Sequence, residues 1–155
     1  MKFIADAMLG RLAKGLRLLG FDVLYYPDID DRQVIKIARE QERTILTRDT
    51  RMLQRKVVSG IVFIKSDRIF EQLLEMKDRL DFHGPDLIKR CGVCNMELHA
   101  ITDRDEIKDL VPEYVYHSFY SFMCCRGCGK IYWEGGHYKN IRERTREVLR
   151  ERLED

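Results

Sequence analysis

The sequence of 155 residues has no long apolar run, only three prolines and no strong charge of either sign. No stretch approaches the roughly 20 apolar residues that span a bilayer, and the N-terminus has no apolar signal core. The formal net charge is only +2, so any nucleic-acid site must be a local basic patch. We therefore expect a soluble, cytoplasmic protein with no membrane partner.

Cysteine is absent from the first 90 residues, although the chain has five. Thiols stay reduced in the cytoplasm, so a metal site is favoured over disulfides. The change in composition near Gly84 and Pro85 indicates a domain at 1–86 and a second at 87–155. Lys and Arg outnumber Asp and Glu by 16 to 14 in the first domain and equal them at 12 each in the second, so neither is strongly basic.

Strand and helix patterns alternate through the first domain. Short apolar runs predict buried strands, and apolar residues at helical spacing follow each run. The predicted strands are Lys2–Ala5, Asp22–Tyr26, Thr44–Thr47 and Gly60–Lys65, and the predicted helices are Met8–Leu19, Asp31–Gln41, Thr50–Lys56 and Arg68–Arg79. This alternation predicts an α/β fold with a mainly parallel sheet and helices on both faces.

An acidic residue follows each predicted strand or opens the helix after it. The four are Asp6, Asp31, Asp49 and Asp67. Parallel strands present their carboxyl ends at one edge of the sheet, where ligands bind. Carboxylates that lie close together need a cation, and Mg²⁺ or Mn²⁺ prefers oxygen ligands. Asp is also a favoured helix N-cap, which accounts for three of these acids but not for Asp6. The sequence predicts a shared metal site that includes Asp6, Asp31 and Asp49, with Asp67 as a further candidate.

Basic residues accompany the acids. Arg11, Lys14 and Arg17 recur every three residues along the first helix. We expect them to follow the backbone of a nucleic-acid strand without reading its sequence, although an ordinary solvated edge has the same spacing. Thr47 and Arg48 would lie beside the acids as substrate-binding residues, with Arg48 either contacting a phosphate oxygen or pairing with an acid.

Two Cys-x-x-Cys pairs characterise the second domain. They are Cys91 with Cys94 and Cys125 with Cys128. Four thiolates suit a closed tetrahedral Zn²⁺ site, which contributes folding energy to a segment with a small core. Cys124 is an alternative to Cys125 as a ligand, and we favour Cys125. His99, His117 and His137 fit ordinary polar histidines better than spare ligands.

The segment between the two pairs is rich in aromatic and β-branched residues. Tyr114–Met123 therefore predicts a strand or hairpin, and Ile131–Glu134 predicts another strand. Exposed aromatic side chains here would stack RNA bases or pack the ribbon; they are Tyr116, Phe119, Tyr120, Tyr132 and Trp133. A final helix over Tyr138–Leu153 interleaves Arg with Glu, which favours a solvated face.

Several of these motifs together resemble a known family. Phe3–Asp6, Asp31–Ala38 and Thr44–Asp49 resemble the acid motifs of PIN-like nucleases. Ala7–Lys14 and Leu18–Asp22, with a zinc ribbon behind them, are more specifically similar to the Mut-seven C-terminal RNase domain family. The similarity extends over nearly the whole chain.

The resemblance implies a PIN-like fold and a metal-dependent ribonuclease activity. It implies that Asp6, Asp31 and Asp49 hold Mg²⁺ or Mn²⁺, that the ribbon holds zinc and that RNA is the partner. Asp67 is added only from its position, because PIN domains often carry a fourth acid near the end of a later strand. The segment before the Asp31 helix is shorter than in many PIN domains.

Two other functions use the same features. A non-catalytic RNA-binding or ribosome-associated adaptor would account for the ribbon, but it has no need to keep Asp6, Asp31 and Asp49. A receiver-like signalling domain also has acids at strand ends, but Lys65 is its only candidate lysine and it gives the ribbon no role. The sequence indicates no particular protein partner.

Overall fold

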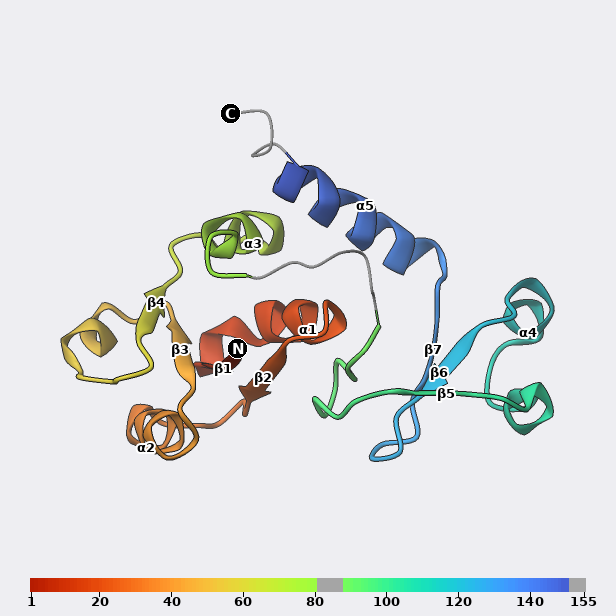
Figure 1. Cartoon of the computed structure of the whole chain (residues 1–155), viewed down its shortest axis with the longest axis horizontal. Coiled ribbons are helices and arrows are strands. Elements are labelled where there is room, and N and C mark those ends of the chain that lie inside the picture. The colour runs from red at the N-terminus through yellow and green to blue at the C-terminus, as the bar shows by residue number, and fades with distance from the viewer. Residues whose placement is uncertain (81–87, 151–155) are drawn as a thin grey trace.

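The computed structural model describes residues 1–80 and 88–150 (Figure 1). Helices and strands alternate through the first part of the chain, as predicted. In order they are β1 (Lys2–Ala5), the 3-10 helix η1 (Ala7–Leu9), α1 (Gly10–Leu18), β2 (Asp22–Tyr25), α2 (Asp31–Gln41), β3 (Thr44–Thr47), the 3-10 helix η2 (Thr50–Gln54), β4 (Ile61–Phe63) and α3 (Ile69–Met76). The predicted domain boundary at residue 86 lies outside the described residues.

Strands β1 to β4 form one parallel sheet in the order β2-β1-β3-β4. Ala5 of β1 pairs with Tyr25 of β2 on one side and with Leu46 of β3 on the other. The strand order therefore reverses between β1 and β3. Ligands bind at such a reversal, outside the carboxyl ends of the strands. Asp6 directly follows β1, so it lies at this point.

Helices cover both faces of the sheet, because successive side chains of a buried strand point to opposite faces. Phe3 and Ala5 pack in one core with α1 and α3, which contributes Leu73. Ile4 packs on the other face with Val34 of α2. The predicted α/β class and parallel sheet are confirmed, and the likeness to the PIN fold stays a prediction.

The second part of the chain contains a small antiparallel sheet in the order β5-β6-β7. Its elements are β5 (His99–Ala100), the 3-10 helix η3 (Arg104–Ile107), α4 (Glu113–Ser118), β6 (Phe122–Cys124), β7 (Ile131–Trp133) and α5 (Gly136–Arg150). Helix α5 returns to lie against α3 (Figure 1). The Arg144 guanidinium is 4.9 Å from the centre of the Phe70 ring, so the two parts contact each other.

The predicted strand or hairpin at Tyr114–Met123 is wrong for its first half. Glu113–Ser118 forms α4, and β6 begins only at Phe122. Val111 and Val115 are both buried and pack with Phe122. Their separation of four residues is helical, but the aromatic residues around them favoured a strand in the sequence.

Helix α5 begins at Gly136, two residues before its predicted start at Tyr138. Thr145 of this helix is buried, and the Arg142 guanidinium pairs with Glu134 at 3.2 Å. The predicted end at Leu153 lies outside the described residues. Across residues 1–80 and 88–150, no helix combines the length and apolarity needed to cross a membrane.

Candidate active site

Asp6 is buried at the carboxyl end of β1, with only 6% of its surface exposed. Its Oδ2 accepts hydrogen bonds from the Thr47 hydroxyl at 2.6 Å and the Arg48 amide at 2.8 Å. Its Oδ1 accepts the Met8 amide at 2.9 Å, so Asp6 is the N-cap of η1, and the prediction that capping does not account for this acid is wrong. Hydrogen bonds to an ionised acceptor are the strong ones, and a buried carboxylate needs them. Asp6 is therefore held in one orientation by two neighbouring strand ends.

Thr47 links Asp6 to Asp49. Its hydroxyl donates to Asp6 and accepts the Asp49 amide at 2.9 Å. Thr47 is fully buried, which corrects its predicted role as a substrate contact. Its hydroxyl orients the Asp6 carboxylate and holds the backbone of Asp49, and it has no exposed surface for a ligand.

The carboxylate of Asp49 is engaged by Arg51. Asp49 caps η2 by accepting the Arg51 amide at 2.9 Å, and the Arg51 guanidinium donates to both carboxylate oxygens, at 2.8 Å for its shortest bond. The hydrogen bond from the Arg51 side chain is the largest cause of a lowered Asp49 pKa. The pKa of Arg51 is raised first by that bond, and then by the charges of Asp49 and Asp31. Arg51, which the sequence prediction missed, is thus the cation that pairs with Asp49.

Asp31 is the first residue of α2 and is exposed. The N-cap is Asp30, whose carboxylate accepts the Gln33 amide at 2.8 Å. The Gln33 side chain accepts the Asp30 amide at 3.2 Å, which completes a capping box. Asp31 is therefore not the helix cap, and the capping explanation for this acid is wrong.

Asp67 lies farther from its strand than predicted. Strand β4 ends at Phe63 rather than Lys65, so the exposed Asp67 is four residues beyond it. The loop is held by Glu75 of α3, whose carboxylate accepts the amides of Lys65 at 2.7 Å and Ser66 at 2.8 Å. A catalytic role for Asp67 stays a prediction.

The acids do not close around a common point in this structure. Among the described residues, one group of three or more metal-ligating side chains has its ligand atoms within 4.8 Å of one another, and it consists of cysteines. The oxygen donors of Asp6, Asp31 and Asp49 suit Mg²⁺ or Mn²⁺ in their chemistry. An ion bound at Asp49 would have to displace Arg51.

The predicted basic edge of α1 is only partly exposed. Arg11 and Lys14 are exposed, but Arg17 is 5% exposed. Its Nε donates to the Val23 carbonyl at 2.8 Å, and its Nη1 donates to the carbonyls of Gly92–Val93 at 3.1 and 3.0 Å. Burial lowers the pKa of Arg17. The prediction that Arg17 contacts phosphate is therefore wrong, because its donors join the two parts of the chain.

Arg48 contributes to the site through its backbone. Its amide donates to Asp6, while its guanidinium lies at the surface, 3.4 Å from the Lys65 carbonyl. The side chain is thus directed to a carbonyl rather than to a neighbouring acid. Contact with a phosphate stays a prediction.

Four cysteine thiols meet in the second part of the chain. They belong to Cys91, Cys94, Cys125 and Cys128, and their Sγ atoms all lie within 4.8 Å of one another. The separation is 3.2 Å between Cys94 and Cys125 and 3.6 Å between Cys91 and Cys128. Zn–S bonds of about 2.3 Å place tetrahedral ligands about 3.8 Å apart, so the cluster fits one zinc ion. It contains Cys125 and not Cys124, as predicted, and no histidine.

Cys91 is the most strongly perturbed of these thiols. Burial acts to raise its pKa, but hydrogen bonds from the Tyr132 side chain and from the amides of Cys94 and Val93 outweigh burial and lower the pKa to about 6. The Tyr132 hydroxyl lies 3.1 Å from Cys91 Sγ and accepts the Gly92 amide at 3.0 Å. A thiolate is the form that binds zinc. Tyr132 is only 1% exposed, so it is not available to stack a base.

The first cysteine turn, Cys91–Asn95, covers the open edge of the parallel sheet. β2 is an outer strand, so the outward N–H and C=O of Val23 need partners. The Val23 amide donates to Asn95 Oδ1 at 3.0 Å, and Arg17 donates to the Val23 carbonyl. The Asn95 side-chain amide also donates to Asp22 Oδ1 at 2.8 Å. The same oxygen accepts a hydrogen bond from Arg43 Nη1 at 2.7 Å. Asn95 has φ of 66°, a conformation that Asn tolerates better than most residues.

The comparisons with known proteins give one match. The family described as Mut7-C RNAse domain matches residues 1–145. No curated protein and no solved structure matches the chain. The matched range includes the parallel sheet, the four cysteines and the first ten residues of α5.

Proposed function

The chain belongs to the Mut7-C RNAse domain family, and from that membership we propose that it is a metal-dependent ribonuclease. The active site would lie at the carboxyl edge of the parallel sheet, around Asp6, Asp31 and Asp49. Asp67 is a fourth candidate from its place after β4. Function has to be argued from the site as well as from the family.

Asp6 gives the proposal its strongest support. Removing a carboxylate from water is costly unless it is hydrogen-bonded, and Asp6 receives three hydrogen bonds while remaining 6% exposed. It also lies where the strand order reverses, the usual place for a ligand in a parallel sheet. Asp6 also caps η1 through the Met8 amide, but capping alone does not account for its burial or for its hydrogen bonds from Thr47 and Arg48.

The chemistry would use oxygen ligands only. Asp6, Asp31 and Asp49 would hold Mg²⁺ or Mn²⁺. When bound, such an ion supplies an activated water for attack on phosphorus and offsets the charge of the leaving oxygen. The chain itself orients Asp6 through Thr47 and neutralises Asp49 through Arg51 while no ion is bound. No side chain has to act as the nucleophile.

The zinc site would be structural. Four sulfur ligands leave no open position for water, so Cys91, Cys94, Cys125 and Cys128 would stabilise the ribbon without taking part in cleavage. The ribbon would aid RNA binding, and Tyr120, which is 76% exposed, is the aromatic side chain that we propose for stacking a base.

One observation favours a second function, an RNA-binding adaptor without catalysis. Arg51 already satisfies Asp49, and the described carboxylates do not gather within 4.8 Å as a group of three. An acidic pocket that binds its own arginine has no need of a metal ion. The two functions differ in whether RNA is cut.

Cleavage of end-labelled single-stranded and hairpin RNA by zinc-loaded protein tests the proposal. The reactions would contain Mn²⁺, Mg²⁺ or neither ion and would compare the wild type with Asp6→Asn and Asp49→Asn. Asp103→Asn is a matched control, because Asp103 caps η3 by accepting the Asp105 amide at 3.0 Å, just as Asp49 caps η2. We expect metal-dependent cleavage that both active-site variants lose and the control retains.

Two results would contradict the proposal. If the wild type binds RNA with a steep salt dependence but cuts nothing, the adaptor is the better account. If both active-site variants cut as fast as the wild type, the carboxylates are not the site. Circular dichroism of each variant would show that a loss of cleavage is not a loss of fold.

A further inference from the structure

A basic groove lies between α2 and the chain at the end of η2. Arg32, Lys36 and Arg39 are four and three residues apart, so they form one stripe along α2. Arg55 ends η2 and contributes the fourth cation. The groove has a volume of about 470 Å³ and is lined by Arg32, Ile35, Lys36, Arg39, Glu40 and Arg55. Four cations and one acid leave it with a surplus of positive charge.

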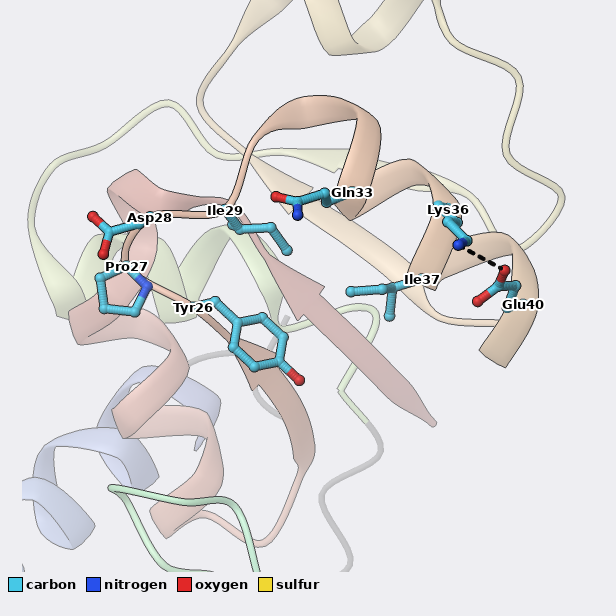
Figure 2. Close-up of a pocket in the computed structure, with 8 residues that line it drawn as sticks. All are labelled: Tyr26, Pro27, Asp28, Ile29, Gln33, Lys36, Ile37 and Glu40. Atoms are coloured by element: carbon cyan, nitrogen blue, oxygen red, sulfur yellow. Dashed lines mark ion pairs between the residues drawn. The ribbon is translucent and has the colours of Figure 1, made fainter.

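The two walls of this α2–η2 groove are joined by a hydrogen bond and by a shared core. The Arg39 guanidinium donates to the Lys56 carbonyl at 2.9 Å, which joins α2 to the chain after η2. Ile35 and Met52 are buried in the same core beneath the two helices. The acid of the groove, Glu40, pairs with Lys36 at 3.8 Å (Figure 2). A ligand would not have to assemble this surface.

A neighbouring hollow has a different character. It shares Lys36 and Glu40 with the α2–η2 groove, but its other lining includes Tyr26, Pro27 and Ile37 (Figure 2). Lys36 is its one cation, and Glu40 pairs with it. This hollow therefore lacks the charge that would hold a polyanion, and the α2–η2 groove has it.

The α2–η2 groove begins beside the acids of the proposed active site. Arg32 directly follows Asp31 at the start of α2, and η2 begins at its cap, Asp49. Arg51 pairs with Asp49, and the charge of Asp31 also acts on it. The two walls of the groove therefore lead away from the two acids.

We propose that the α2–η2 groove binds the sugar-phosphate backbone of single-stranded RNA and leads one phosphate to Asp31 and Asp49. The inference rests on the proposed ribonuclease function and names its substrate path. Guanidinium groups match phosphate oxygens with paired donors, and such contacts position a strand without reading its sequence. The α1 edge offers only Arg11 and Lys14 once Arg17 is buried.

The test measures binding of a fluorescein-labelled single-stranded RNA of about 12 nucleotides by anisotropy. The protein is zinc-loaded, with no Mg²⁺ or Mn²⁺ added, so that binding is read without cleavage. The variant is Arg32→Gln/Lys36→Gln/Arg55→Gln, which leaves Arg39 to hold the groove wall. Three lost phosphate contacts, at roughly 0.7 each, should lower the slope of log affinity against log salt by about 2, which is about a 100-fold loss near 0.1 M salt.

A matched control separates the groove from net charge. Arg68→Gln/Lys77→Gln/Arg79→Gln also removes three positive charges, but around α3, which packs on the opposite face of the sheet. It should keep the wild-type salt slope. Arg11→Gln/Lys14→Gln tests the α1 edge in the same assay, and a smaller loss is expected there.

Wild-type affinity and salt slope in the groove variant would overturn the inference, as would an equal loss in the α3 control. The binding assay does not depend on cleavage. If these results are obtained and the wild type still cuts RNA, the ribonuclease proposal stands and only the groove is ruled out as its substrate path. If the groove variant loses binding while the wild type cuts no RNA with either ion, the groove stands as an RNA-binding surface and the ribonuclease proposal fails. Equal unfolding midpoints for all variants would show that the fold is intact.

Discussion

Replacing Asn95 with glycine should destabilise the parallel sheet, although Asn95 lies in the cysteine turn. The Val23 amide is buried and would lose its acceptor, at a cost of about 1–3 kcal/mol. The bond from Asn95 to Asp22 would also be lost, which adds about 1 kcal/mol. Glycine adopts the positive φ of this position without strain, which offsets part of the loss. We expect a net decrease of about 2 kcal/mol in the free energy of unfolding.

Urea unfolding of zinc-loaded protein measures this loss, and amide hydrogen exchange locates it. The Val23 amide should exchange faster in Asn95→Gly, whereas the Leu24 amide, which the alternation of the strand turns toward β1, should change less. Glu42→Gly is the control, because Glu42 is exposed and also has a positive φ, of 54°. Glycine there should leave stability equal or slightly higher.

One pair of results would refute this reasoning. If Asn95→Gly unfolds at the same urea concentration as the control and the Val23 amide keeps its wild-type exchange rate, Asn95 does not cap β2. A loss of stability with unchanged exchange at Val23 would place the effect within the cysteine turn alone. The zinc content of each variant should be measured, so that a lost ion is not mistaken for a lost hydrogen bond.

Three further predictions concern the acids and the zinc site. Arg51→Ala should bind Mn²⁺ about two- to fivefold more tightly by calorimetry, since an exposed pair competes only weakly for Asp49; weaker binding would contradict this. Burial acts to raise the Asp22 pKa, but hydrogen bonds from Arg43 and Asn95 outweigh it and lower the pKa below its ordinary 3.8. Asp22 should therefore stabilise the fold above about pH 4 and lose this effect below it, so the stability difference from Asp22→Asn should shrink in acid; a constant difference would argue against it. Removing zinc with a chelator should speed exchange at the Val23 amide, and an unchanged rate would show that the cap holds without the ion.

The two inner strands of the parallel sheet could be predicted to the residue, whereas the outer strands β2 and β4 are shorter than predicted. Strands β1 and β3 cover Lys2–Ala5 and Thr44–Thr47, as expected from their apolar runs. A short apolar run between polar turns leaves few other structures for the chain. The four-cysteine cluster followed from spacing in the same way, because two Cys-x-x-Cys turns bring four sulfurs together where the ribbon folds.

Contacts between distant parts of the sequence could not be predicted. Arg17 looks like any exposed cation at a spacing of three, and its partners at Gly92–Val93 lie 75 and 76 residues away. Helical periodicity shows that a helix has an edge, but it does not show which edge another segment covers. The helix at Glu113–Ser118 was missed for a local reason, since aromatic content favoured a strand over the weaker spacing signal.

The position of Asp6 at the end of β1 could be predicted, but the partners of the acids could not, and their catalytic role stays a prediction. Asp6 could be located because it directly follows β1, and the place where β1 ends depends only on the fold of the sheet. The partners of Asp49 depend on side-chain conformations, and nothing in the sequence separates Arg51 from Arg48 as the residue that pairs with it. Asn95 has one signal in retrospect, because an Asn after a cysteine pair suits a left-handed turn.

The cap on β2 has a consequence for attempts to divide the protein. A fragment ending at Leu80 would keep Asp6 and the entire parallel sheet, but it would leave the outer edge of β2 without Asn95. An uncovered edge strand is a template for pairing with another molecule. Such a fragment should self-associate in solution and run as mixed oligomers on a sizing column, because the parallel sheet would have lost the residue that covers its edge.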